Sequence, residues 1–228
     1  MTTHYRRVVA AVVLSVLASL VVTAVRDGAT GTEADAVFPD GIVVVGDSIT
    51  ARYDDDPGSP QQGWWSVVGR HFASDVRTYA QSGSGYQRPG LRCGGERFAD
   101  RLAAFEGPAP SLFIVEGGRN DWASCREGSF VRSSDAAVQS AVEGYFRLLD
   151  ERLPSSTRVV VLGPPWGPRD PWEMRRITSI VRTAAERHGL EYVSTRGTLD
   201  APGRTVDGVH PNLAGSRALG ETVVAALS

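Results

Sequence analysis

The sequence predicts an α/β fold built around a parallel sheet. Five short runs rich in β-branched residues alternate with longer segments of helical periodicity, which is the pattern that parallel strands and their crossover helices produce. The first and third runs are almost purely apolar, as expected for strands that helices bury on both faces. A length of 228 residues with 42% hydrophobic and 22% charged residues fits one globular domain of this class.

The strands are expected where the β-branched runs occur, and each run ends abruptly in polar or glycine residues. In chain order they are Ile42–Val45, Asp75–Tyr79, Leu112–Val115, Arg158–Leu162 and Glu191–Ser194. Helices are expected between the strands and after the last one, at Trp64–Phe72, Arg97–Phe105, Ser134–Leu153, Pro171–His188 and Asn212–Leu227.

The helix at Ser134–Leu153 has the clearest signal. Apolar side chains recur at helical spacing from Val138 to Leu149, which gives the segment one face for the core. Ser133 or Ser134 can cap its first turn, and Pro154 follows its end, where a proline cannot continue the helix.

Residues 1–36 are expected to be a targeting segment followed by a short spacer. Residues 8–25 are apolar apart from three hydroxyl side chains, and Arg6-Arg7 precede them, as in a signal sequence. This length lies between that of a long signal peptide and that of a short membrane span, and Ala34-Asp35-Ala36 offers a cleavage motif. A cleaved signal peptide and a retained signal anchor both stay open. Either one places the domain, residues 37–228, in a secreted or extracytoplasmic location, with membrane contact only through this segment.

The charged residues exclude several classes of function. All 24 basic residues are arginine, which excludes a P-loop and a lysine Schiff base. The 26 acidic residues balance them, so nucleic acid is not an expected partner. The acidic run Asp54-Asp55-Asp56 precedes Pro57-Gly58-Ser59-Pro60 and is interpreted as a solvated loop. No metal and no cofactor are expected.

Cys93 and Cys125 are the two cysteines of the chain. They form no C-x-x-C pair and have no histidine nearby, which disfavours a zinc site. In an oxidising compartment they are free to form a disulfide, which would stabilise the fold by roughly 3–4 kcal/mol in the chain-entropy model. Two separate buried thiols are the alternative.

Ser48 follows the first expected strand, at the sheet edge where open α/β sheets place their sites. A serine nucleophile needs a base within hydrogen-bond reach, and histidine suits that task. Of the four histidines, His4 lies in the targeting segment, and His71 and His188 end helices. His210, which follows the last strand, is therefore the candidate base.

Asp207 lies three residues before His210 and can accept a hydrogen bond from its Nδ1, which orients the imidazole toward the serine. The alternative is that Asp207 only caps a turn and His210 only opens the last helix. Acyl transfer also needs donors for the developing oxyanion. The backbone N–H of Gly85, the side-chain amide of Asn120 and the N–H of Ser48 itself are the candidates.

Four segments together resemble the SGNH/GDSL hydrolases, and the resemblance covers the whole folded part. They are Gly46-Asp47-Ser48, the glycine-rich turn that ends at Gly85, Gly118-Arg119-Asn120-Asp121 and Asp207-Gly208-Val209-His210. The resemblance implies a three-layer α/β/α, flavodoxin-like fold with a five-stranded parallel sheet in the order 2-1-3-4-5. It implies that Ser48, His210 and Asp207 form a catalytic triad and that Ser48, Gly85 and Asn120 supply the oxyanion hole.

Two departures from the family pattern stand beside this resemblance. Ile49-Thr50 replaces the Leu-Ser of the family name, and Ala80 or Gln81 stands where many relatives have asparagine. The second departure leaves the choice between Gly83 and Gly85 as oxyanion donor less secure.

Four residues beside these motifs are candidates for a substrate pocket. Asp47 precedes Ser48, Tyr86 follows Gly85, Trp122 follows Asn120 by two residues, and Trp166 follows the fourth strand. Packing in the core is the alternative for the aromatic side chains.

The sequence therefore predicts an exported, monomeric serine esterase that hydrolyses carboxylic esters with short acyl groups through an acyl-enzyme. The ester is expected on a small molecule, a glycan or a lipid. An acyltransferase that uses the same triad to acylate a cell-envelope glycan is one alternative. A glycan-binding module that has the SGNH-like fold without turnover is another.

Overall fold

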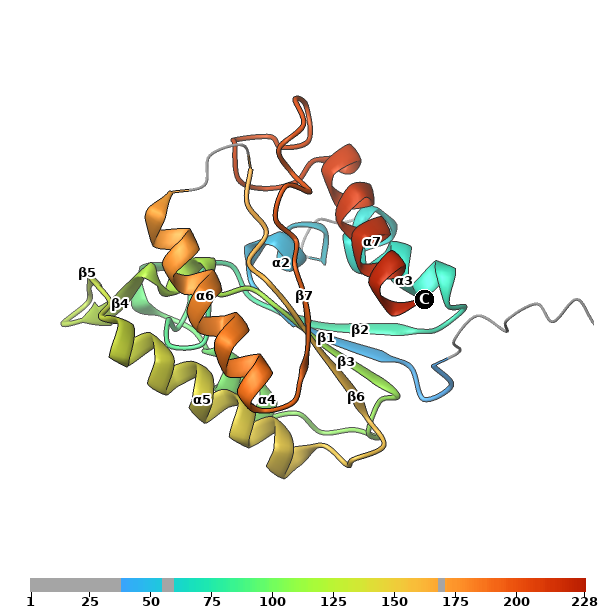
Figure 1. The fold of residues 1–228 in the computed structure, drawn as a ribbon, viewed down its shortest axis with the longest axis horizontal. Helices are drawn as coiled ribbons and strands as arrows, with labels where there is room; N and C mark the ends of the chain where they lie inside the picture. The colour runs from blue at the N-terminus through green and yellow to red at the C-terminus, as the bar shows by residue number, and fades with distance from the viewer. Residues whose placement is uncertain (1–37, 55–59, 168–170) are drawn as a thin grey trace, which may run out of the picture. The chain divides into compact units, whose positions relative to one another are not determined.

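The computed structural model describes residues 38–54, 60–167 and 171–228 (Figure 1). The expected targeting segment lies outside these residues, and so do Asp55 and Asp56 of the acidic run. Among the described residues, no helix is both long and apolar enough to cross a membrane.

Five parallel strands form one sheet in the order β2-β1-β3-β6-β7, which confirms the expected 2-1-3-4-5 order of sheet strands. β1 and β3, at the centre, are buried along their whole length, as their apolar sequences predict. The strands are β1 (Ile42–Gly46), β2 (Val76–Ala80), β3 (Leu112–Glu116), β6 (Arg158–Leu162) and β7 (Glu191–Val193).

Helices follow or connect the strands as expected, and a further short helix begins directly at Ser48. They are α2 (Ser48–Asp54), α3 (Trp64–His71), α4 (Phe98–Ala103), α5 (Asp135–Arg152), α6 (Trp172–Arg187) and α7 (Leu213–Leu227), with 3₁₀ turns η1 (Pro60–Gln62), η2 (Leu91–Cys93) and η3 (Arg119–Trp122). Ser134 caps α5 by accepting the N–H of Ala137 at 3.2 Å, and Asn212 caps α7 in the same way. Both caps satisfy a donor that the first helical turn leaves without a partner.

Two helical layers enclose the sheet (Figure 1). α4, α5 and α6 cover one face, and α3 and α7 cover the other. Val43 and Val45 of β1 pack with the first layer, whereas Val44 packs with the second, because successive side chains of a strand point to opposite faces. The three-layer α/β/α architecture predicted from the sequence is confirmed.

A two-stranded hairpin is also absent from the sequence prediction. β4 (Ala123–Arg126) and β5 (Ser129–Arg132) form an antiparallel hairpin directly after η3. Its two-residue turn places Glu127 and Gly128 at positive φ, the backbone conformation that a tight hairpin turn requires. β5 is exposed along its length, so the hairpin lacks the buried, β-branched run that marks the central strands.

Candidate active site

The carboxyl edge of the sheet brings all four sequence motifs together. β1 lies between β2 and β3, so the segments that follow β2 and β3 flank Ser48, the first residue of α2. The segment after β2 carries Gly85, and the segment after β3 carries Asn120 in η3. The turn before α7 reaches the same edge with Asp207 and His210.

A continuous chain of hydrogen-bonding groups joins Ser48, His210 and Asp207. The Nε2 of His210 lies 2.9 Å from the Oγ of Ser48, and its Nδ1 lies 2.7 Å from the Oδ2 of Asp207. If Nδ1 carries the proton that Asp207 accepts, Nε2 is left with a lone pair directed at the serine hydroxyl. The arrangement can therefore take a proton from Ser48.

Asp207 is held in place by its own turn. Its Oδ1 accepts the backbone N–H groups of Val209 at 2.9 Å and of His210 at 2.7 Å. Burial works against the charged form, but the hydrogen bonds from the His210 ring and from the two N–H groups prevail and lower the pKa of Asp207 to about 2. The carboxylate is therefore ionised at neutral pH, as an acceptor for an imidazolium must be.

The three candidate oxyanion donors differ in how they are engaged. The N–H of Ser48 stands at the first position of α2, where no preceding turn supplies an acceptor. The N–H of Gly85, predicted as an oxyanion donor, already donates to the carbonyl of Arg88 at 2.9 Å. The Nδ2 of Asn120 donates to the carbonyl of Ser84 at 2.9 Å and to Asp47 at 3.2 Å. Buried N–H donors in folded proteins usually have an acceptor, as these two do. An oxyanion would therefore have to share the Gly85 and Asn120 donors with their present acceptors or replace those acceptors.

Asp121 anchors the segment that follows Gly85. Its buried carboxylate accepts the N–H groups of Tyr86 at 2.9 Å, Gln87 at 2.9 Å and Arg88 at 3.2 Å. Burial raises the pKa of Asp121 to about 6, against the lowering effect of these three hydrogen bonds. One side chain of η3 thus fixes the backbone that carries the Gly85 amide.

A pair of buried carboxyl groups lies beneath Ser48. Asp47 and Glu116 are both fully buried, so Asp47 does not line an open pocket, which corrects that prediction. The Oε2 of Glu116 accepts the N–H of Asp47 at 3.3 Å and the hydroxyl of Thr50 at 2.8 Å. Burial, and then the nearby Asp47, raise the pKa of Glu116 well above its ordinary value. Burial and mutual repulsion therefore disfavour two full negative charges on this pair.

Arg101 of α4 ties the strand ends to the glycine-rich segment. It is 7% exposed, and its Nη2 donates to the carbonyl of Gly46 at 3.0 Å and to the hydroxyl of Ser84 at 3.1 Å. Its Nε donates to the carbonyl of Tyr79 at 3.0 Å. One guanidinium therefore contacts both Gly46, which lies two residues before Ser48, and Ser84, which precedes Gly85. Its several N–H donors can bind more than one acceptor at once.

The three aromatic candidates for a substrate pocket lie in different environments. Tyr86 is 2% exposed and packs against Phe98 and Tyr145, so it belongs to the core, which corrects the pocket prediction. Trp122 is 43% exposed at the end of η3. Trp166 is half-buried, with the guanidinium of Arg119 4.0 Å from its ring centroid.

The two cysteines lie on segments next to the site. Cys93 ends η2, after the segment that carries Gly85, and Cys125 lies in β4, after η3. The structure places their sulfur atoms at bonding distance, with the Cα atoms 5.6 Å apart. A bond between them would link the two segments that flank Ser48.

Sequence reasoning missed the roles of Glu116, Arg101, Arg119 and Asp121. Glu116 ends β3, and Arg119 and Asp121 lie in η3 just after it. This position at the functional edge of the sheet is a signal that could have singled them out. Arg101 gives no such signal, because an arginine in a helix is usually solvated and only the fold shows that it is buried.

The fold and the residues gathered at its carboxyl edge define a hydrolase of the SGNH/GDSL class. Residues 44–218 match the model of the GDSL-like lipase/acylhydrolase family, and the chain belongs to that family. It is therefore a hydrolase with activity of the lipase or esterase type.

Similar proteins agree with this assignment. A GDSL lipase of Mycobacterium tuberculosis is 30% identical over 199 residues, which are 82% of this chain and 81% of the relative. A member of the lipolytic G-D-S-L family from Veillonella parvula matches 81% of this chain and 96% of its own at a TM-score of 0.58 and 19% identity. A family 2 carbohydrate esterase with a carbohydrate-binding domain from Corynascus thermopiles matches 84% of this chain and 67% of its own at a TM-score of 0.60 and 18% identity. The two solved structures show the same fold.

Proposed function

We propose that this hydrolase is an exported serine esterase whose nucleophile is Ser48 and whose base is His210. The observation that carries the proposal is the 2.9 Å separation of the Ser48 Oγ and the His210 Nε2, together with the 2.7 Å separation of the His210 Nδ1 and Asp207. These groups come from two segments 162 residues apart, and the fold aligns them at the edge where parallel sheets of this kind carry their sites.

In the first half of the reaction, the Ser48 oxygen attacks the carbonyl carbon of the ester while His210 takes the hydroxyl proton. The ester carbon–oxygen bond then breaks, and the same proton passes from His210 to the departing alcohol. In the second half, His210 takes a proton from water, which attacks the acyl-enzyme, and returns that proton to Ser48 as the acid leaves. Asp207 keeps the imidazole oriented and stabilises its transient positive charge.

The tetrahedral intermediate needs hydrogen-bond donors for its oxyanion. The N–H of Ser48 supplies the first, because α2 begins there and its amide has no helical acceptor. The Asn120 amide and the Gly85 N–H supply the others when the oxyanion replaces or shares the acceptors that they contact in the structure.

The targeting segment expected at residues 1–36 supports export, and export favours esters outside the cytoplasm. Short acyl esters on cell-envelope carbohydrate are therefore the first substrates to test, and lipid esters are the second. A matched series of p-nitrophenyl esters, from acetate through butyrate to octanoate, separates short-chain from long-chain preference.

The test compares the full-length chain with its Ser48→Ala variant on this series. Ser155→Ala is the matched control, because Ser155 is exposed at the opposite end of the sheet, before β6. We expect turnover in the wild type and the control, with the highest kcat/KM for acetate, and loss of turnover in Ser48→Ala. Wild-type turnover no faster than that of Ser48→Ala would reject the esterase assignment.

A further inference from the structure

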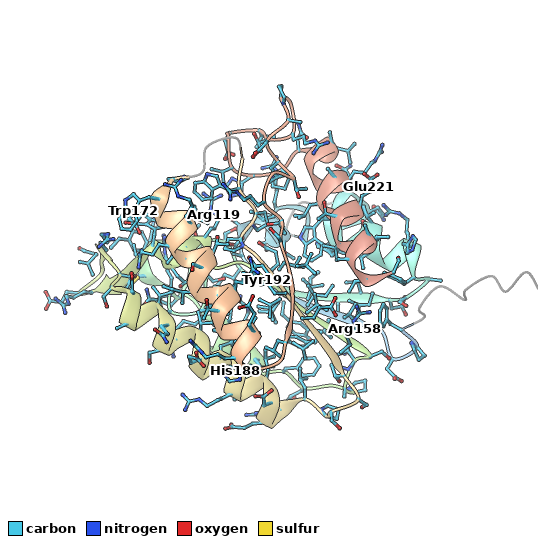
Figure 2. All side chains as sticks on the ribbon, viewed as in Figure 1. Arg119, Arg158, Trp172, His188, Tyr192 and Glu221 are labelled. Carbon is cyan, nitrogen blue, oxygen red and sulfur yellow. A yellow bond between two sulfur atoms is a disulfide. The ribbon has the colours of Figure 1, made fainter. Side chains whose placement is uncertain are left out.

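Arg119 lies beside the candidate catalytic residues and has unused hydrogen-bond donors. It precedes Asn120 in η3, which contacts α6, and Figure 2 shows it close to that helix. Its Nη1 is buried and has no hydrogen-bond partner. Within the described part of the chain, no carbonyl or carboxylate accepts a hydrogen bond from this guanidinium, although such a group offers five N–H donors.

The positive charge of Arg119 is also left without an ion pair among the described residues. Asp47, Glu116 and Asp207 attract it only from a distance, and burial raises the pKa of Glu116, which disfavours the charged form of that carboxyl group. An arginine stays charged when it is buried. Arg119 is half-buried, and its buried Nη1 without a partner costs free energy. At an active site a ligand is the physical explanation for retaining such a donor.

Trp166 holds the guanidinium in a fixed orientation. The ring lies 4.0 Å from the central carbon of the Arg119 guanidinium, a distance typical of a cation–π stack. Stacking uses the face of the planar group and leaves its edge, where the N–H donors are, for a ligand. Trp166 therefore restrains the guanidinium, while its N–H donors, among them the unpartnered Nη1, stay available to a ligand.

Trp166 also lines a cavity of about 320 Å³, together with residues of α6, of β7 and of the segments that follow β6 and β7. Its charged lining residues are Arg175, Arg182, Arg196 and Asp200, and Arg182 is also paired with Glu186. A cavity of this size can admit a group as large as a sugar ring. Arginines outnumber acidic residues among these lining side chains, so the cavity and the neighbouring Arg119 both favour an anionic group.

The backbone next to Trp166 shows which part of an ester would enter this region. Gly167 packs so closely on Gly208 that an added Cβ would lie 2.5 Å from the Gly208 carbonyl oxygen. Gly208 lies in the turn between Asp207 and His210. Because His210 delivers its proton to the leaving alcohol, the alcohol departs on the side of this turn. The segment that carries Trp166, the partner of Arg119, therefore packs against the turn on the alcohol side of the site.

We propose that Arg119, oriented by Trp166, binds an anionic group on the alcohol part of the substrate ester. The group would be a carboxylate or a phosphate, which match the donor fork of a guanidinium. The substrates would then be acyl esters of acidic alcohols, such as an acylated sugar acid or sugar phosphate. This inference rests on the proposed esterase function and adds a specificity residue to it.

The test uses two acetate esters that differ in one group, 4-acetoxybenzoate and its neutral analogue 4-acetoxybenzamide. The quantity compared is the ratio of their kcat/KM values in the wild type, in Arg119→Gln and in Arg147→Gln. Arg147 is an exposed arginine of α5 and serves as the control. Comparing the ratio between variants cancels the difference in intrinsic reactivity of the two esters.

We expect the ratio to fall about tenfold in Arg119→Gln, the scale of one charge-assisted hydrogen bond, and to stay at the wild-type value in Arg147→Gln. An unchanged ratio in a folded Arg119→Gln variant would overturn the inference. The product pair 4-hydroxybenzoate and 4-hydroxybenzamide gives a measurement on the wild type alone, which does not depend on the folding of a variant. Equal inhibition of the wild type by the two products would also overturn it.

The same assays separate this inference from the esterase proposal. If Ser48→Ala hydrolyses both esters as fast as the wild type does, the proposed function fails. If hydrolysis depends on Ser48 but the anionic ester gains nothing from Arg119, only the anionic subsite fails.

Discussion

A Cβ atom on Gly85 would lie 2.5 Å from the Oδ2 of Asp121. This is the carboxylate whose two oxygens accept the three successive backbone N–H groups after Gly85. The Asp121 carboxylate therefore fits against this backbone only because residue 85 has no side chain. This close contact between Gly85 and Asp121 determines the orientation of the Gly85 N–H.

Gly85→Ala should displace this segment, because the methyl group cannot occupy the space of the buried carboxylate. We expect kcat/KM for p-nitrophenyl acetate to fall at least about tenfold and the free energy of unfolding to fall by about 1–3 kcal/mol, as for other overpacked sites. Gly144→Ala is the control, because a Cβ there has its nearest neighbour, the Nη2 of Arg147, only at 4.0 Å, inside helix α5. Wild-type kcat/KM in Gly85→Ala would contradict the fit described here.

Asp121→Asn tests the charge of this carboxylate through its pH dependence. The pKa of Asp121 rises from 3.8 to about 6 on folding, mainly because of burial. Between these values the folded state binds more protons than the unfolded state, so this group makes wild-type stability fall as pH rises from about 4 to about 6. Asparagine does not titrate, but it loses an acceptor for one of the N–H groups.

We therefore expect Asp121→Asn to be less stable than the wild type at pH 4 and the difference to shrink as pH approaches 6. Urea unfolding at several pH values in this window measures it. A difference that is constant with pH would show that Asp121 does not titrate in this range.

The sequence predicted the two strands β1 and β3 most clearly because they are buried on both faces. Runs such as Ile42–Val45 and Leu112–Val115 are apolar throughout, and burial on both faces is the property that such runs report. The β4–β5 hairpin escaped prediction because its exposed strands lack that signal, and its turn at Glu127 and Gly128 depends on local backbone conformation.

Parts of the candidate site could be predicted from the sequence. These are the positions after strand ends where acyl transfer requires a particular residue type. Ser48, Asp207 and His210 fall in this group, and the structure brings them within hydrogen-bond distance of one another. The engagement of the Gly85 N–H by Arg88 was not predictable, because it depends on how one short segment folds back on itself. The burial of Tyr86 depends likewise on packing between elements distant in sequence.

The pair Cys93 and Cys125 should stabilise both the fold and the site if it is oxidised. The double variant Cys93→Ser, Cys125→Ser removes the link between the segments beside Ser48. We expect the free energy of unfolding to fall by about 3 kcal/mol and kcat/KM to fall as well, because the oxyanion donors lie on those segments. Urea unfolding and ester hydrolysis with and without dithiothreitol measure both effects. If reduction changed stability but not turnover, the link would serve the fold alone.

Asp207→Asn tests how the imidazole is oriented. Asparagine can still accept the N–H groups of Val209 and His210, so the turn should keep its shape. Its side-chain amide favours the tautomer in which Nε2 carries the proton, and that nitrogen cannot accept the proton of Ser48. We expect kcat to fall by about 10³–10⁴ at pH 7 with the fold retained. Asp75→Asn, at an exposed carboxylate before β2, is the control and should keep wild-type kcat.

The pH profile of wild-type turnover completes this test of the base. Asp207 has a pKa of about 2, so it is ionised throughout the range from about pH 4 to 9. Any loss of activity on acidification within this range must then come from another group. Asp121, which positions the Gly85 segment, has a pKa of about 6, and a protonated His210 cannot accept the serine proton. We expect kcat/KM for p-nitrophenyl acetate to fall steadily on the acid side and to level off on the alkaline side. A flat profile would mean that the imidazole 2.9 Å from Ser48 does not act as its base, whatever the effect of Asp207→Asn.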